Sequence, residues 1–200
     1  MRIAVFASGR GTNFGALIRA VKKGLIKAEL SLLVCDNPKA PAIGRAKRAG
    51  IKVALVEAYD LPDKSAFESA IIRHLEENKI DLILLAGFMR LLSPELVSRY
   101  HGRILNIHPA LLPSFKGSHG IKDAFEYGAK VTGVTVHFVD EKMDHGPIIL
   151  QKEVKIEESD TLESLEGKIH KIEHRLYPEA VRLFVEGRLK LEGRKVSISS

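Results

Sequence analysis

The sequence predicts an α/β protein built on a doubly wound, mainly parallel β-sheet, with a late antiparallel strand pair and a long C-terminal helix. Short apolar runs alternate with segments whose apolar residues recur every three or four positions, the pattern of repeated strand–helix units. The runs at 3–7 and 81–86 are almost continuously apolar, which is typical of strands buried on both faces. After residue 130, two alternating strands follow each other directly, and one long helical pattern comes next.

The first third of the chain contains three of the predicted strands and two helices. A strand at 3–7 leads into the glycine-containing turn at 8–13, and a helix follows. The remaining elements are a strand at 30–35, a helix at 42–49 and a strand at 52–56. The helix after the turn is predicted from the spacing of Phe14, Leu17, Ile18 and Val21.

The middle of the chain contains the strand that we expect at the centre of the sheet, at 81–86. A loop at 60–63 and a helix with Phe67, Ile71 and Leu75 on one face precede it. His74 shares that face and is interpreted as packed or at its rim. An apolar loop at 87–94 follows, with Ser93 as the predicted cap of the next helix. A strand at 104–108 then ends at a proline.

The last third begins with a short helix through Ala124 and Phe125. The strands at 131–139 and 148–154 are expected to pair in antiparallel fashion at the edge of the sheet. The final helix is predicted to start at a capping pair of Asp160 and Glu163. Its apolar stripe is Leu162, Leu165, Ile169, Ile172, Leu176 and Leu183. Two hundred residues suit one domain, so we predict a single domain over 1–200.

The composition argues against a nucleic-acid-binding, membrane-spanning or disulfide-bonded protein. The net charge is +6, but the basic residues are spread along the chain, so no nucleic acid partner is expected. No apolar run reaches the roughly 18 residues that span a bilayer, and the N-terminus lacks the layout of a signal peptide. Cys35 is the only cysteine, which excludes an internal disulfide or a cysteine zinc site. We therefore predict a cytoplasmic protein without a membrane partner.

The turn after the first strand is a candidate anion site. Gly11, Thr12 and Asn13 open a helix whose N–H groups would attract a phosphate. The dinucleotide fingerprint G-x-G-x-x-G is a competing interpretation, although the third glycine, Gly15, comes one place late. Asp36 would then imitate the ribose-binding acid of a nicotinamide enzyme. A third interpretation is that the glycines merely permit a tight turn.

The end of the strand at 104–108 is a candidate catalytic position. Asn106 and His108 share a face because side chains two apart on a strand point the same way. Ligands of open α/β sheets bind beyond the carboxyl ends of strands, so an amide and an imidazole here suggest chemistry. The simpler alternative is a strand end with two polar residues facing water. The loop at 87–94 is either core or a wall for a flat aromatic ligand, and local pattern favours core.

With these motifs placed, the chain resembles the folate-dependent phosphoribosylglycinamide formyltransferases of purine biosynthesis, from Met1 to about Arg188. The resemblance implies a Rossmann-like formyltransferase fold whose N-terminal half binds phosphate and whose C-terminal half binds folate and is catalytic. The motifs that carry it are Ser8-Gly-Arg-Gly-Thr-Asn13, Leu85-Ala-Gly-Phe-Met-Arg-Leu-Leu92, Leu105-Asn-Ile-His-Pro-Ala-Leu-Leu-Pro113, Thr132-Gly-Val-Thr-Val-His137, Asp144-His-Gly-Pro147 and Glu173-His-Arg-Leu-Tyr-Pro178.

The resemblance also implies roles for individual residues. The catalytic trio would be Asn106, His108 and Asp144. Substrate phosphate and ribonucleotide would be bound by Gly11, Thr12, Asn13, His170, Lys171, Ile172 and Glu173. The folate would be bound by Lys64, Met89, Arg90, Leu91, Leu92, Val139, Asp140, Glu141, Lys142 and Met143, which reverses the preference for core in the loop at 87–94. Lys64 stands where the family can have arginine, and His119 lies in a loop that only partly keeps the family pattern.

The implied reaction moves a formyl group from 10-formyltetrahydrofolate to the amine of 5-phosphoribosylglycinamide. Asn106 and protonated His108 would stabilise the oxyanion, and Asp144 would keep His108 charged and accept the amine's proton through water. No metal is expected, and the protein would be a monomer or a homodimer. Hydrolysis of formyl-folate, nicotinamide-dependent oxidoreduction and non-catalytic nucleotide binding are the alternatives.

Overall fold

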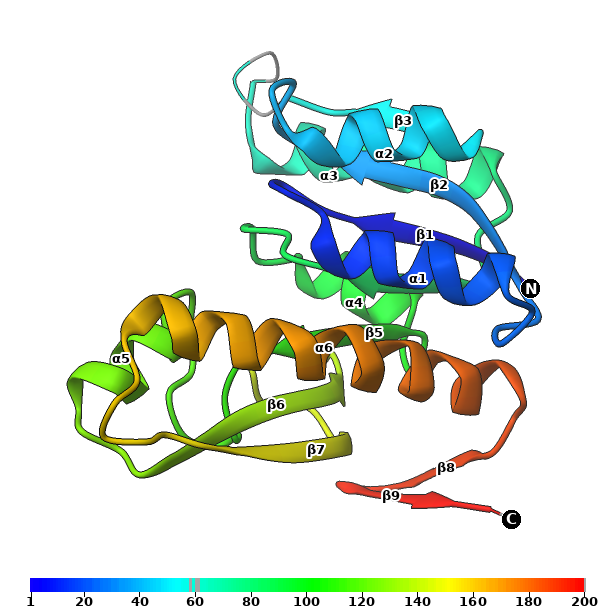
Figure 1. Ribbon diagram of the computed structural model, residues 1–200. Helices are drawn as coiled ribbons and strands as arrows, with labels where there is room; N and C mark the ends of the chain where they lie inside the picture. The colour runs from blue at the N-terminus through cyan, green and yellow to red at the C-terminus, as the bar shows by residue number, and fades with distance from the viewer. Residues whose placement is uncertain (58, 60–61, 200) are drawn as a thin grey trace. The chain divides into compact units, whose positions relative to one another are not determined.

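The computed structural model describes residues 1–57, 59 and 62–199, which divide into two compact units, Met1–Leu105 and Asn106–Ser200 (Figure 1). The strand order of the main sheet is β3-β2-β1-β4-β5-β6-β7. Of the loop predicted at 60–63, residues 60 and 61 lie outside the described part of the chain. No helix in the described part is long and apolar enough to cross a membrane.

The first unit is organised around β1 (Arg2–Phe6), which pairs in parallel with β2 (Glu29–Cys35) and β4 (Leu82–Leu85). β3 (Lys52–Leu55) continues the parallel arrangement beyond β2. The side chains of β1 from Ile3 to Phe6 are fully buried. The continuous apolar runs of the sequence are therefore explained by strands that are covered on both faces.

Helices cover both faces of these strands. Figure 1 shows α1 (Thr12–Lys22) and α2 (Pro41–Ala49) in front of them, and α3 (Lys64–Glu77) and α4 (Pro94–Arg99) behind. The doubly wound arrangement predicted from the sequence is confirmed. The predicted cap of α4 is also correct, because the Ser93 side chain accepts a hydrogen bond from the Leu96 N–H.

The second unit takes in the end of β5 (Ile104–His108), the short helix α5 (Gly120–Glu126) and the strands β6 (Val131–Phe138) and β7 (Ile148–Lys155). β6 and β7 pair in antiparallel fashion, and β7 is the last strand of the sheet order. This confirms the late antiparallel pair predicted at the sheet edge. The long helix α6 (Leu162–Val185) packs on both strands of the pair.

The start of α6 differs from the prediction. Thr161 is the N-cap, and its side chain and that of Ser164 form a reciprocal capping box. Asp160 instead accepts hydrogen bonds from Ser164 Oγ at 2.7 Å and Lys168 Nζ at 2.6 Å. The predicted capping pair of Asp160 and Glu163 was wrong by one residue, because a hydroxyl at position 161 satisfies the same backbone donors.

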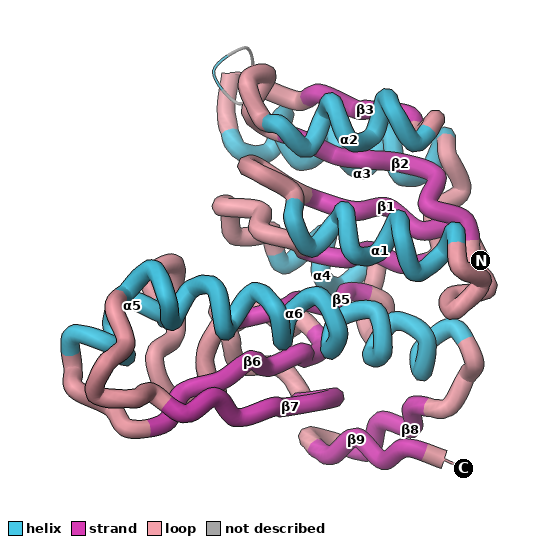
Figure 2. Tube along the Cα trace, viewed as in Figure 1, coloured by secondary structure: helices cyan, strands magenta, loops and turns pink. Residues whose placement is uncertain are grey.

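A C-terminal hairpin was missed. β8 (Leu189–Glu192) and β9 (Lys195–Ile198) form a separate two-stranded antiparallel sheet, drawn in red in Figure 1 and as magenta strands in Figure 2. Gly193 has a φ of 58°, the positive value that a two-residue hairpin turn requires. Apolar and polar residues alternate on both sides of this glycine, so the sequence did contain the signal.

Candidate active site

The two polar side chains of β5 do not face open water. His108 is only 3% exposed, and Asn106 is half-buried on the same face of the strand. The simpler interpretation of this strand end is therefore wrong for His108. A buried imidazole needs hydrogen-bond partners, and those partners define the site.

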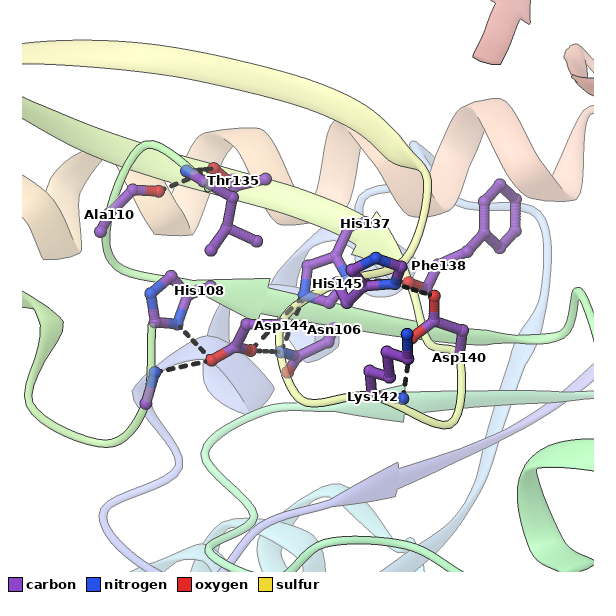
Figure 3. A network of polar contacts seen from close by, with 12 residues as sticks. Asn106, His108, Ala110, Thr135, His137, Phe138, Asp140, Lys142, Asp144 and His145 are labelled. Atoms are coloured by element: carbon purple, nitrogen blue, oxygen red, sulfur yellow. Dashed lines mark hydrogen bonds and ion pairs between the residues drawn. The ribbon is translucent and has the colours of Figure 1, made fainter. Parts of the chain in front are cut away.

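Asp144 joins these two residues from the loop that follows β6. Its Oδ2 lies 3.5 Å from His108 Nδ1 and accepts a 2.8 Å hydrogen bond from the Gly117 N–H. Its Oδ1 accepts a longer, 3.4 Å bond from Asn106 Nδ2. Figure 3 shows the carboxylate pointing at both side chains. The structure thus brings together the three residues predicted to be catalytic, within the second unit.

The partners of His108 indicate where its protons lie. Nε2 is 2.8 Å from the Phe115 carbonyl oxygen, which can only accept, so Nε2 carries a proton. Nδ1 faces the Asp144 carboxylate. A proton on Nδ1 as well would make the ring a cation paired with the Asp144 carboxylate. The geometry suits an imidazolium held in place from both sides.

His137 on β6 is a site residue that the sequence reasoning did not assign. It is 1% exposed, and its Nδ1 donates to the Phe138 carbonyl at 2.7 Å. Its Nε2 is then the acceptor for Asn106 Nδ2 at 3.2 Å, and it lies 3.8 Å from Asp144 Oδ1. A histidine on a strand whose other residues are apolar, glycine or threonine was the available signal. His137 orients the Asn106 amide.

The charge state of Asp144 follows from these contacts. Burial alone would raise the pKa of its carboxyl group. The hydrogen bond from the Gly117 N–H and a positive charge on His108 are among the interactions that outweigh burial, and the pKa of Asp144 lies below its usual value. Asp144 is therefore a carboxylate at neutral pH, as the predicted mechanism needs.

The rest of the loop after β6 is more open. Met143 is 52% exposed, Glu141 and Lys142 are exposed, and Val139 and Asp140 are half-buried. The Asp140 carboxylate accepts from the Lys142 N–H at 3.0 Å. These residues were predicted to contact folate, and their exposure leaves them accessible to a ligand.

On α6, two polar residues that lie off the apolar stripe, His170 and Glu173, form a pair. His170 Nδ1 lies 2.8 Å from Glu173 Oε2, and Glu173 is only 4% exposed. Because Glu173 lies off the apolar stripe, the helical pattern alone would place it in solvent, whereas the structure buries it. Lys171 is exposed and Ile172 is half-buried. A buried carboxylate with a histidine partner is an acceptor suited to sugar hydroxyls.

In the first unit, the predicted phosphate loop has an uncapped helix start. Gly11 is the N-cap of α1 with a φ of 63°, and no side chain caps the described helix. Asn13 is buried, and its Oδ1 has no hydrogen-bond partner among the described residues. Thr12 is half-buried. A Cβ on Gly11 would lie 2.8 Å from the Ala42 side chain, so this glycine is also needed for packing against α2.

The loop at 87–94 is not core throughout. Met89 is 68% exposed and Leu91 is 59% exposed, while Leu92 is half-buried. The local preference for core was therefore wrong for Met89 and Leu91, and the wall predicted from the resemblance is compatible with their exposure. The Met89 N–H donates to Ser8 Oγ at 3.0 Å, which ties this loop to the turn after β1.

Arg90 and Asp36 bear on the nicotinamide alternative. Arg90 Nε donates to Asp36 Oδ2 at 2.7 Å, and its guanidinium lies over the Phe67 ring. The Asp36 side chain is only 8% exposed, and its other carboxylate oxygen, Oδ1, is buried without a hydrogen-bond partner in the described residues. A ribose hydroxyl would have to displace Arg90 from Oδ2 or reach the buried Oδ1, which weakens the dinucleotide interpretation.

Two further predicted positions are exposed. Lys64 is the first residue of α3, and His119 precedes α5 with its Nδ1 3.0 Å from Ser118 Oγ. Neither is held in a defined geometry by several partners. In the described part of the chain, no group of three or more histidine, cysteine, aspartate or glutamate side chains is arranged to hold a metal ion.

Known proteins resemble this chain over most of its length. The formyl transferase family matches residues 1–181. The chain is 48% identical to the phosphoribosylglycinamide formyltransferase of Bacillus subtilis, covering 90% of this chain and 93% of that protein. The structure of glycinamide ribonucleotide transformylase 1 from Symbiobacterium toebii is 44% identical, with a TM-score of 0.97 over 100% of this chain and 94% of that one.

A longer relative contains the same region. The trifunctional purine biosynthetic protein adenosine-3 of Gallus gallus is 43% identical over 96% of this chain, which corresponds to 19% of that protein. The family match runs without a break across both compact units. The chain belongs to the formyl transferase family.

Proposed function

We propose that this chain transfers the formyl group of 10-formyltetrahydrofolate to the amine of 5-phosphoribosylglycinamide, a step of de novo purine biosynthesis. The products are 5-phosphoribosyl-N-formylglycinamide and tetrahydrofolate. The observation that carries the proposal is the buried cluster of Asn106, His108 and Asp144 in a member of the formyl transferase family. The formyl-folate is a co-substrate here, and the mechanism needs no metal.

The cluster supports each chemical step. Attack of the amine on the formyl carbon forms a tetrahedral intermediate that carries an oxyanion. The Asn106 amide can turn its N–H to that oxygen at low cost, because the 3.4 Å bond that it leaves is long. A protonated His108 would supply positive charge beside it. Asp144 would stabilise the cation and accept the proton of the amine through water. The intermediate then collapses as the bond between the formyl carbon and the folate nitrogen breaks, and that nitrogen takes up the proton as tetrahydrofolate leaves.

The binding residues are proposed by analogy with the family and by their exposure. Gly11, Thr12 and Asn13 would bind the phosphate, because no side chain caps the start of α1 in the described chain and its backbone N–H groups are donors. His170, Lys171, Ile172 and Glu173 would meet the ribonucleotide. The folate would contact Lys64, the loop at 89–92 and the loop at 139–143, where Met89, Leu91 and Met143 expose apolar surface.

Both units would serve one activity, since the family match continues across their boundary. A single functional domain, a cytoplasmic location and a monomeric or homodimeric state stay predictions. Hydrolysis of formyl-folate, with water as acceptor, is the nearest rival activity.

One assay separates the activities. Protein and 10-formyltetrahydrofolate are mixed with and without 5-phosphoribosylglycinamide, and release of tetrahydrofolate is followed. Release that depends on the ribonucleotide, with one formylglycinamide product per folate, is expected. Release at the same rate without the ribonucleotide would identify a hydrolase. No release, together with stoichiometric NADPH binding, would support the nicotinamide alternative.

A further inference from the structure

The backbone at Asp144 has an unusual conformation. Its φ is 47°, in the left-handed region that residues with a side chain rarely adopt. Such a conformation is strained and persists only where the surrounding structure imposes it. Because this backbone directs the carboxylate toward His108, whatever imposes it also sets the geometry of the catalytic cluster.

One end of the loop lies against the last residue of β6, and the other end is held by a hydrogen bond within the loop. A Cβ on Gly146 would lie 1.8 Å from the Phe138 carbonyl oxygen, so the backbone there lies directly against the end of β6. At the other end, the Asp140 side chain accepts from the Lys142 N–H. Neither contact bonds the carbonyl group of His145, the residue that follows Asp144. That carbonyl has its partner elsewhere in the chain.

Arg194 supplies this partner. Its Nη2 donates to the His145 carbonyl oxygen at 2.7 Å, and its Nη1 lies 3.3 Å from both ring nitrogens of the same residue. His145 Nδ1 in turn lies 2.6 Å from Asp140 Oδ2. Figure 3 marks this contact with a dashed line. One guanidinium therefore holds both the backbone and the ring of His145, and the ring ties the far end of the loop back to its beginning.

The negative charge of Asp140 is consistent with the contacts that link Asp140, His145 and Arg194. Burial would raise the pKa of Asp140, but its hydrogen bonds with His145 and the Lys142 N–H, together with the positive charge of Arg194, lower it. An ionised Asp140 accepts the proton of His145 Nδ1. The other ring nitrogen, Nε2, then offers a lone pair to Arg194.

Arg194 is placed by the hairpin that the sequence reasoning missed. It follows Gly193 in the turn between β8 and β9, and β9 packs against β7. Arg188 closes the open end of the hairpin through the Ser199 carbonyl at 2.7 Å. The family match ends at residue 181, so this support comes from a segment outside the matched region.

We propose that Arg194 is a positioning residue for Asp144: by clamping His145, the C-terminal hairpin fixes the left-handed backbone that aims the Asp144 carboxylate at His108. The inference rests on the proposed catalytic role of Asp144. Arg194 itself touches none of the three predicted catalytic residues in the contacts described above. Its effect is expected on turnover and on the ionisation of His108.

The test compares Arg194→Ala, Arg194→Lys and the control Lys190→Ala in the full chain. Lys190 lies on the same hairpin and pairs only with Glu192 among the ion pairs of the described chain, so its loss should leave activity unchanged. Arg194→Ala should lower kcat roughly 10- to 100-fold, the range expected when a reacting group is displaced by about 1 Å. The KM for the ribonucleotide should stay close to that of the wild type.

Arg194→Lys should recover part of the lost turnover, because an ammonium can still donate to the His145 carbonyl but cannot also reach the ring. Titration of the His108 ring by NMR gives a readout that does not depend on activity. In Arg194→Ala the ring should lose its proton at lower pH than in the wild type, because the carboxylate has moved away. Thermal melting shows whether each variant is folded.

Wild-type kcat and an unmoved His108 titration in a folded Arg194→Ala would overturn the inference. Equal losses in Arg194→Lys and Arg194→Ala with a large drop in melting temperature would also overturn it, since they would indicate a purely structural role. The variant Asp144→Asn separates this outcome from failure of the proposed function. If Asp144→Asn is fully active, the proposed mechanism is wrong, whereas an inactive Asp144→Asn beside a normal Arg194→Ala refutes the positioning role alone.

Discussion

The polar groups around Asp144 have partners within the chain, whereas those at the start of α1 are left without side-chain partners in the part of the chain that the structure describes. Each Asp144 oxygen has a partner within the chain, and so do both ring nitrogens of His108. At the start of α1, no side chain caps the described helix, and Asn13 Oδ1 is buried without a partner in the described residues. A buried polar atom without a partner costs about 1–3 kcal/mol. This cost applies to Asn13 Oδ1, whereas both Asp144 oxygens avoid it through their partners.

The difference separates two functions. Groups that must be held in a fixed geometry during a reaction are bonded to the protein, because catalysis depends on preorganised charges and dipoles. Groups that receive a ligand are left with unused bonding capacity, which the ligand then fills. Variants of the first region should therefore change turnover, and variants of the second should change substrate affinity.

The largest expected effect comes from Asp144→Asn, which removes the charge and keeps the shape. Turnover should fall by roughly 10²–10⁴-fold, the usual contribution of positioned proton transfer. The KM values should change little. The His108 ring should also lose its proton at lower pH than in the wild type, since the attractive charge is gone. Steady-state kinetics and NMR titration measure the two effects.

Asp123→Asn is the control for this variant, because Asp123 is an exposed carboxylate of α5 in the same unit. It should behave like the wild type. If Asp144→Asn keeps near-normal turnover, the carboxylate is only a loop residue and the mechanism is wrong.

The second prediction concerns Asn13, at the uncapped helix start. Asn13→Ala should raise the KM for 5-phosphoribosylglycinamide by roughly 10- to 100-fold, because a hydrogen bond to a charged group contributes about 1.5–3 kcal/mol. The KM for the folate should not change. Asn13→Asp should raise the ribonucleotide KM further, since it places a negative charge beside the phosphate. Initial rates measured over a range of concentrations of both substrates give the two KM values of each variant.

Gly11 is unsuitable for this test. A side chain there would meet Ala42 and would force a positive φ on a residue other than glycine, so folding and binding would be damaged together. If Asn13→Ala raises both KM values equally, the start of α1 does not select the phosphate.

The third prediction concerns the exposed apolar loop after β4. Leu91→Asp should weaken binding of a folate analogue by roughly tenfold, because about 1–2 kcal/mol of apolar burial is lost. Leu25→Asp is a matched control: Leu25 is 57% exposed and Leu91 is 59% exposed, and both lie in the first unit. Isothermal titration calorimetry measures affinity, and circular dichroism checks folding. Equal weakening in both variants would refute the folate wall.

Strand alternation, apolar runs and helical spacing in the sequence were sufficient to predict much of the fold and two central residues of the candidate site. Alternation placed Asn106 and His108 on one face, and continuous apolar runs identified the buried strands of the first unit. Asp144 entered only through the resemblance. Its position depends on a left-handed backbone that no local composition of the loop reveals.

The residues that sequence reasoning misjudged depend on contacts between distant segments. Glu173 lies off the apolar stripe of α6 and is nonetheless buried beside His170. His137 is recognisable only once β6 lies where Asn106 can reach its ring. Arg194 belongs to a hairpin of four-residue strands, and its contact with His145 joins positions 49 residues apart. Helical and strand periodicity carry no information about such pairs.

The smallest expected effect is the contribution of the Asp144 carboxylate to the free energy of unfolding, which depends on pH. The pKa of Asp144 is lowered in the folded state, so its ionised form is favoured by folding. That contribution is fully present above the unfolded value of about 3.9, and it is lost as pH falls through the lower folded value. Asp140 and Asp160 also have lowered pKa values, so the pH dependence of the wild type alone cannot be assigned to one residue.

The difference between wild type and Asp144→Asn isolates the contribution of Asp144, because the asparagine does not titrate and the other carboxylates are common to both proteins. Urea denaturation from about pH 6 down to about pH 2 gives the free energy of unfolding of each protein at each pH. The advantage of the wild type should be constant above about pH 5 and shrink as the pH falls. A difference that stays constant down to pH 2, or that grows, would mean that the charge of Asp144 does not stabilise the fold, and that the buried cluster owes its geometry to the neutral hydrogen bonds and to the loop backbone.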